Sequence, residues 1–114
     1  MKNAVLEKSF CFAARIVKLN RYLKTQKKEY VMSKQLLRSG SSIGANIAEA
    51  QQAQSRADFA SKLNIALKEA YETDYWLRLL HTTDYLNDKE FHSIYSDCKE
   101  LEYLLTSIVK RAKT

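Results

Sequence analysis

The chain has no proline and only two glycines among its 114 residues, and this scarcity constrains the fold more than any other feature. Sheet-rich architectures draw on glycine and proline at most of their tight turns. A chain that lacks these residues is expected to consist of long helices joined by few connections. The length suits one domain, so the sequence predicts a single all-α domain over residues 1–114.

Apolar residues recur every three to four positions along four segments, which is the period of an amphipathic helix. The segments cover approximately residues 4–24, 30–54, 55–84 and 87–112. Capping patterns support two of the starts, at Ser55 with Asp58 three residues later and at Asn87 with Glu90 three residues later. Short connections make successive helices antiparallel. We therefore expect an antiparallel up-down-up-down four-helix bundle.

Two of these segments carry a second apolar set in addition to the stripe that a four-helix core requires. In residues 4–24 the second set is Leu6, Phe10, Ala13 and Val17. In residues 55–84 it is Ile65, Trp76, Leu79 and Leu80. An apolar surface without a partner inside its own chain favours contact with another copy, so these sets predict self-association.

Both glycines lie in an unusual stretch, residues 38–46, which is rich in serine. Glycine and serine disfavour a helix interior, but the apolar period continues through Ile43 and Ile47. Gly40 and Gly44 are four apart and share one helix face, where they would allow a neighbouring backbone to approach closely. The alternative is a phosphate-binding glycine loop, which lacks its G-x-x-x-x-G-K-[ST] pattern and a preceding strand. We interpret the stretch as helix.

The positive charge is concentrated at the start of the chain. Residues 1–30 have eight lysines and arginines against Glu7 and Glu29, a net charge of +6 that equals the net charge of the whole chain. Such an asymmetry is typical of proteins that bind a negatively charged partner, although a solvated helix face is the alternative. The candidate phosphate contacts are Lys8, Arg15, Lys18, Arg21, Lys24, Lys27, Lys28, Lys34 and Arg38. Tyr22 and Tyr30 are candidates for stacking on bases.

A pair of glutamates, Glu69 and Glu72, could serve acid–base chemistry, but the neighbouring sequence supplies no nucleophile or histidine partner. Structural ion pairing with Arg38 is the preferred interpretation, with Asn46 and Glu49 in a shared polar network. The alternative is a functional carboxylate pair.

No pattern indicates a metal, a cofactor or a catalytic residue. His81 and His92 lack a glutamate three residues before them, so the Glu-x-x-His motif of di-iron bundles is absent. His81 is expected to be structural, Cys11 and Cys98 to be free thiols, and Cys98 to lie in the core. The sequence has no apolar run long enough for a membrane span and no signal peptide, which predicts a cytoplasmic protein without a membrane partner.

Residues 35–50, with the sequence QLLRSGSSIGANIAEA, resemble the signature of the four helix bundle protein family, also called 23S rRNA-intervening sequence proteins. Asp58-Phe59, residues 63–70 and Glu72-Thr73 resemble the second signature block of that family. Many relatives have proline at the position of Gly44 and glycine at the position of Ala50, so this chain is similar to a glycine-containing subgroup.

The resemblance implies an up-down bundle that assembles as a homopentamer, encoded in some bacteria within 23S rRNA genes. A related basic pentamer is the accessory protein of diversity-generating retroelements, which binds nucleic acid and a reverse transcriptase. The resemblance transfers no catalytic residue. From the residues and the resemblance together we expect a non-enzymatic, oligomeric module that binds RNA or DNA through the basic face of its first helix. The alternative is a protein–protein scaffold or accessory subunit that docks a partner enzyme.

Overall fold

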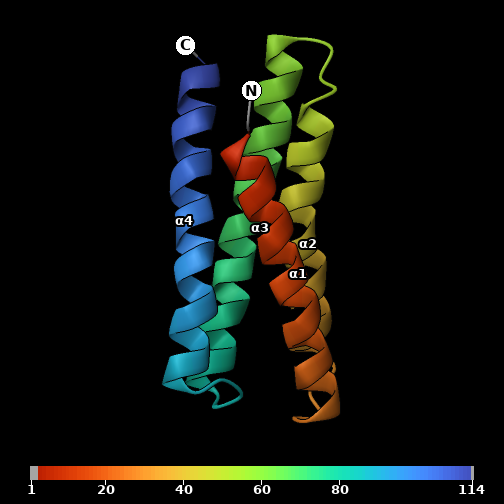
Figure 1. The fold of residues 1–114 in the computed structure, drawn as a ribbon, viewed down its shortest axis with the longest axis vertical. Helices are drawn as coiled ribbons and strands as arrows, with labels where there is room; N and C mark the ends of the chain where they lie inside the picture. The colour runs from red at the N-terminus through yellow and green to blue at the C-terminus, as the bar shows by residue number, and fades with distance from the viewer. Residues whose placement is uncertain (1–2, 114) are drawn as a thin grey trace.

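The computed structural model describes residues 3–113, which form four helices and no strand within that range. The helices are α1 (Ala4–Thr25), α2 (Met32–Ala50), α3 (Arg56–Thr82) and α4 (Asp88–Ala112). They pack side by side into a bundle with dimensions of 44 × 22 × 20 Å (Figure 1). The all-α bundle predicted from the sequence is confirmed.

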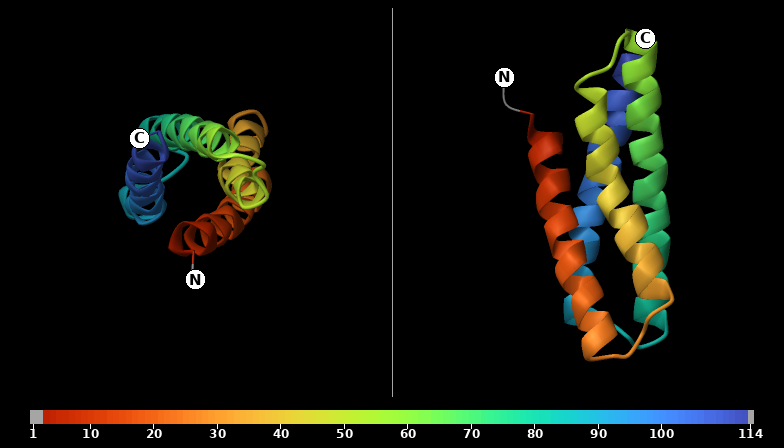
Figure 2. Two further views of the ribbon diagram at one scale, coloured as in Figure 1. Left: turned by 90° about the horizontal axis from the view of Figure 1, so that it is seen from above. Right: turned by 90° about the vertical axis from the view of Figure 1, so that its right-hand side faces the viewer.

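Contacts between neighbouring helices show the relative direction of these helices. Arg38 of α2 meets Glu69 and Glu72 of α3, and Glu49 near the end of α2 meets Lys62 near the start of α3. The helices α2 and α3 therefore run in opposite directions, and Figure 1 shows the same alternation for the other consecutive helices. Seen from the end of the bundle, the four helices follow one another around an arc, and the spacing between neighbouring helices is largest between α1 and α4 (Figure 2). Of the neighbouring pairs, α1 and α4 pack least closely.

The core is built from the apolar stripes that the helical period predicts, with Leu86 added from the loop between α3 and α4. Its largest fully buried side chains are Phe12, Ile16, Leu23, Leu36, Ile43, Ile47, Leu63, Leu77, Leu80, Leu86, Leu101 and Leu105. Leu80 is a correction, because the sequence placed it in the second apolar set of its helix, whereas its side chain is fully buried. Cys98 lies in the core as predicted.

The helix α2 is shorter than predicted at both ends, because it begins at Met32 instead of Tyr30 and ends at Ala50 instead of Gln54. The buried Glu29 fixes its start: the Glu29 carboxylate accepts hydrogen bonds from the backbone N–H groups of Val31, Met32 and Ser33 at 2.8–3.2 Å. These are the N–H groups that a helix start leaves without a backbone partner. The N-cap residue itself is Val31, whose side chain cannot accept a hydrogen bond, so capping patterns in the sequence did not indicate this start.

The glycine positions in α2 allow close packing against α1. A Cβ atom built on Gly40 would lie 2.9 Å from both γ-carbons of Ile16, which is closer than carbon atoms pack. A Cβ on Gly44 would lie 3.3 Å from Ser9 Oγ and 3.4 Å from the Ser9 carbonyl oxygen. Residues 38–46 are helical, so the interpretation of this stretch as a close-packing helix is confirmed.

Candidate nucleic-acid interface and a buried carboxyl pair

The nine basic residues proposed from the sequence fall into two groups in the structure. Three of them, Lys8, Arg15 and Arg38, form ion pairs with carboxylates of neighbouring helices. The other six are exposed and have no carboxylate within 4 Å in the range 3–113: Lys18, Arg21, Lys24, Lys27, Lys28 and Lys34. Lys2, which also contributes to the charge of the first thirty residues, lies outside the described residues.

The paired residues of α1 hold it against α4. Lys8 Nζ lies 3.3 Å from Glu100 Oε2, and Arg15 Nη1 lies 2.6 Å from Asp97 Oδ2. The Arg15 guanidinium also donates to the carbonyl and hydroxyl oxygens of Ser93 at 3.1 and 2.8 Å. The charges of Lys8 and Arg15 therefore serve the seam between the two helices, where contact is otherwise sparse.

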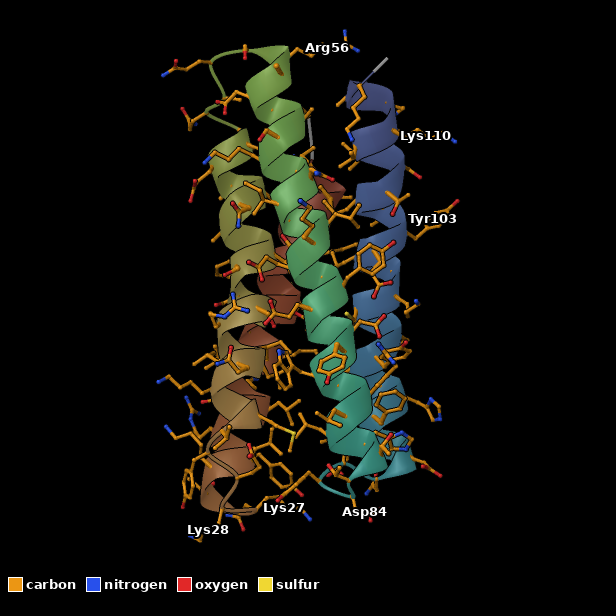
Figure 3. All side chains as sticks on the ribbon, turned by 180° about the vertical axis from the view of Figure 1, so that it is seen from behind. Lys27, Lys28, Arg56, Asp84, Tyr103 and Lys110 are labelled. Atoms are coloured by element: carbon orange, nitrogen blue, oxygen red, sulfur yellow. The ribbon has the colours of Figure 1, made fainter. Side chains whose placement is uncertain are left out.

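The six unpaired residues lie together at the end of the bundle where α1 leads into α2, and we call this surface the basic end. It comprises the last two turns of α1, the connecting loop and the first turn of α2. Figure 3 shows Lys27 and Lys28 at this end, opposite the end that carries Arg56 and Lys110. The acid of the loop, Glu29, does not offset these charges at the surface, because its carboxylate is buried against the start of α2.

The two tyrosines proposed for stacking have different surroundings. Tyr30 is exposed in the loop of the basic end. Tyr22 is half-buried and lines a cleft of about 530 Å³ between α1 and the start of α4. Tyr22 is therefore part of the wall of a cleft, whereas Tyr30 is exposed in a loop.

The polar network predicted around Arg38 comprises three of its five proposed members. Arg38 lies 3.3 Å from Glu69 Oε1 and also forms an ion pair with Glu72. The hydrogen bond from Arg38, followed by one from Trp76 Nε1, lowers the pKa of Glu72. The remaining two members, Asn46 and Glu49, lie elsewhere: Asn46 Nδ2 donates to the Ser42 carbonyl oxygen, and Glu49 pairs with Lys62. A carboxylate fixed by an arginine in this way is a weak base.

A second carboxyl pair, Asp74 of α3 and Glu102 of α4, was missed by the sequence reasoning. Both residues are buried, with exposed fractions of 5% and 4%. Asp74 Oδ1 accepts hydrogen bonds from Arg78 Nε at 2.8 Å and from the Tyr95 hydroxyl at 3.0 Å. Lys99 Nζ lies 3.0 Å from Glu102 Oε1 and 3.5 Å from Asp74 Oδ2, so one ammonium group bridges both acids.

Hydrogen bonds separate the pKa values of the two buried acids. Burial, followed by the hydrogen bond with Asp74, raises the pKa of Glu102 to about 7. Burial also acts to raise the pKa of Asp74, but hydrogen bonds from Glu102, Arg78 and Tyr95 outweigh it, and the pKa lies below its usual value. Asp74 is thus ionised near neutral pH, whereas Glu102 is still partly protonated there.

A signal for this pair was present in the sequence. Asp74 falls between Ala70 and Leu77 on the core stripe of its helix, and Glu102 falls four residues after Cys98 on the next. A charged residue at a core position of an amphipathic helix requires a buried partner. The two acids are 28 positions apart in the sequence and are brought together only by the packing of α3 against α4, so no local pattern pairs them.

The remaining candidate groups are engaged in packing. His81 is half-buried, stacks on Phe91 with ring centroids 4.1 Å apart, and contacts Asp88 through Nε2 at 2.7 Å. Burial raises the pKa of the Cys98 thiol, which makes it a poor nucleophile.

Among residues 3–113, no group of three or more histidine, cysteine or acidic side chains could hold a metal ion. None of the described helices is both long and apolar enough to cross a membrane.

Two helix faces expose apolar side chains away from the core. On α1, Phe10 is 75% exposed and Val17 is 40% exposed. On α3, the exposed side chains are Ile65, Tyr71 and Tyr75. These faces include members of the second apolar sets that the sequence identified.

Comparisons with known proteins agree with this structure. The model of the family described as 23S rRNA-intervening sequence protein matches residues 1–107. A crystal structure of a protein with unknown function from the S23 ribosomal protein family of Bacteroides thetaiotaomicron VPI-5482 is 60% identical, with a TM-score of 0.93. The match covers 94% of this chain and 99% of that chain. No curated protein matches the chain. Because the family model spans nearly its full length, the chain belongs to the 23S rRNA-intervening sequence protein family.

Proposed function

We propose that the chain is a non-enzymatic, self-associating module that binds nucleic acid through the basic end. One observation carries this proposal: six exposed lysines and arginines gather at one end of the bundle with no carboxylate of the described residues paired to them. A cluster of this kind attracts a polyanion, because each phosphate that it contacts releases bound counterions. The phosphate contacts that we propose are Lys18, Arg21, Lys24, Lys27, Lys28 and Lys34, whereas the ion pairs of Lys8, Arg15 and Arg38 favour structural roles for these three.

The non-enzymatic part of the proposal rests on how the reactive groups are held. Glu69 and Glu72 are bound by Arg38, Asp74 and Glu102 are buried in their own hydrogen bonds, and the Cys98 thiol has a raised pKa. A general base or nucleophile must reach a substrate at a suitable pKa. None of these groups meets both conditions.

Self-association is supported by the exposed apolar faces of α1 and α3. A homopentamer is the assembly that the family resemblance implies, and a ring would bring several basic ends into one larger positive surface. Light scattering of the purified chain measures its mass directly. We expect a multimer, and we expect Phe10→Asp on α1 to reduce the mass because it charges one of these faces. A monomeric mass for the unmodified chain would contradict this part of the proposal.

Salt dependence of binding tests the nucleic-acid interface. We expect fluorescence anisotropy to show binding to a labelled single-stranded RNA that weakens steeply with salt. The double variant Lys27→Ala/Lys28→Ala removes two contacts, so the slope of log affinity against log salt should fall by about 1.4. The matched control is Lys68→Ala/Lys110→Ala, which removes the same charge away from the basic end and should leave the slope unchanged. Equal effects of the two double variants, or no binding at low salt, would contradict the proposal.

The alternative function, a scaffold or accessory subunit that docks a partner enzyme, is favoured by the exposed tyrosines of α3, since tyrosine is enriched at protein interfaces. Charge reversal at Lys18 and Arg21 separates the two functions. Loss of RNA binding with a protein partner retained in a pulldown would favour the scaffold.

A further inference from the structure

The cleft between α1 and the start of α4 has the composition of a small-molecule site. Its α1 wall consists of Arg15, Lys18, Leu19 and Tyr22. Its other wall, from the α3–α4 loop and α4, consists of Leu86, Lys89, Glu90, Ser93 and Ile94. The volume of about 530 Å³ lies within the usual range for sites that enclose one small ligand. The cleft exists because α1 and α4 pack less closely than the other neighbouring helices.

The floor and one wall of the cleft suit a flat, weakly polar ring. Leu86 and Ile94 are core residues that close the bottom of the cleft. Leu19 and Tyr22 are only partly buried, so their apolar and aromatic surfaces are available to a ligand in the cleft. An aromatic side chain beside aliphatic ones is a stacking surface that accepts any nucleobase.

The charges at the rim favour an anion. Lys18 and Lys89 are exposed and lie on opposite walls, and neither has a carboxylate of the described residues within 4 Å. The acid of the cleft, Glu90, accepts a hydrogen bond from the backbone N–H of Asn87 at 2.9 Å in the capping box of α4, and the three basic residues of the lining outnumber it. The positive end of the α4 dipole lies at the same place. Arg15 is held in position by Ser93 and Asp97.

We infer that this cleft binds one nucleotide of a single-stranded nucleic acid, with the base against Tyr22 and the adjoining phosphate between Lys18 and Lys89. The inference rests on the proposed function and deepens it. Lys18 belongs both to the cleft and to the basic end, so a strand whose phosphates follow the basic end passes the mouth of the cleft. An unstacked base can enter the cleft, whereas a base paired within a duplex cannot. The chain is therefore specific for single strands.

Substitution of the cleft residues tests this inference. The probe is a fluorescein-labelled oligoadenylate RNA of about ten nucleotides, measured by anisotropy with the full chain. Tyr22→Leu keeps the apolar bulk but removes the ring, and it should weaken binding about fivefold or more, while Tyr22→Phe should restore it. Lys89→Ala should weaken binding and lower the salt slope by about 0.7. The matched controls are Tyr103→Leu and Lys110→Ala, which lie far from the basic end (Figure 3) and should change neither quantity.

A second measurement separates failure of the cleft from failure of the proposed function. Adenosine monophosphate and ribose 5-phosphate are titrated into isotope-labelled chain, and backbone amide shifts are followed at Leu19 and Ser93. Shifts caused by the nucleotide but not by the sugar phosphate support the cleft even if the RNA does not bind. RNA binding that the Tyr22 and Lys89 substitutions leave unchanged would overturn the cleft and retain the basic end. Absence of both RNA binding and nucleotide shifts would overturn both inferences.

Discussion

The acids on the two sides of α3 differ in their burial and in their partners. Toward α2, Glu69 and Glu72 lie near the surface and pair with Arg38, whose side chain is 47% exposed. Toward α4, Asp74 and Glu102 are buried, burial raises the pKa of Glu102, and one lysine bridges the two acids. Water can solvate the first set of charges if the pairing is broken, but it reaches the two carboxylates of the second set far less, because their side chains are only 7% and 6% exposed.

This difference in burial decides what each cluster contributes. Exposed ion pairs add little to stability, because water already stabilises the separate charges. A buried acid contributes only while its partners are present, since its desolvation must be offset inside the protein. We therefore expect the α3–α4 cluster to control the stability of the bundle and its pH dependence, and the α2–α3 cluster to affect both only slightly.

The largest effect is expected from Asp74→Ala. This substitution leaves the Tyr95 hydroxyl and Glu102 without their buried partner, so the free energy of unfolding should fall by about 2–4 kcal/mol in urea denaturation near neutral pH. The matched control is Glu69→Ala, on the same helix but facing α2, which should cost at most about 1 kcal/mol. Similar losses for the two variants would refute the comparison.

The pH dependence of stability sharpens the comparison further. The pKa of Glu102 is raised to about 7, so between about pH 4.5 and 7 the folded state binds more protons than the unfolded state. Its contribution to stability is therefore fully present below the unfolded pKa and is lost as the pH rises through the folded pKa. Across this window we expect wild-type stability to decline by about 1–3 kcal/mol from this group.

Glu102→Gln tests this window directly, because the amide imitates the protonated acid and cannot ionise. Urea denaturation at several pH values should show that the variant lacks the decline of the wild type and equals or exceeds its stability at about pH 8. The matched control is Glu100→Gln on the exposed face of α4, which should retain the wild-type decline. A decline of equal size in Glu102→Gln would show that Glu102 is ionised at all these pH values.

The fold could be predicted from local patterns because each helix carries its own apolar period and two helices carry recognisable caps. The start of α2 could not, since it depends on Glu29 folding back on three backbone N–H groups. The sequence predicted that the helix face with Gly40 would allow close packing. It did not predict that Ile16 of α1 packs against this face. Local sequence therefore determines which segments are helical, and their exact bounds follow from side chains that reach across a turn.

The candidate site could likewise be predicted only in part from the sequence. That the basic residues concentrate in the first helix and the following loop was visible in the sequence. Which of them pair with an acid depends on partners that are distant in the sequence, as Arg15 with Asp97, 82 residues away, shows. The cleft beside Tyr22 likewise depends on how far α1 stands from α4, which no local pattern encodes. A charge count identified the surface, and tertiary packing determined which of its charges are available to a ligand.

The smallest effect is expected at the exposed cluster, from Arg38→Ala. This substitution should lower the free energy of unfolding by about 0.2–1 kcal/mol, and added salt should reduce the difference because exposed charges are screened. A double-mutant cycle with Glu72→Gln isolates the pairing and leaves Trp76 an acceptor. The Arg38 hydrogen bond lowers the pKa of Glu72, so the coupling is present above the usual glutamate pKa and should be lost as the pH falls through the folded value. A coupling that is large, insensitive to salt and retained in acid would mean that water does not compete for these charges, and the two sides of α3 would then be alike.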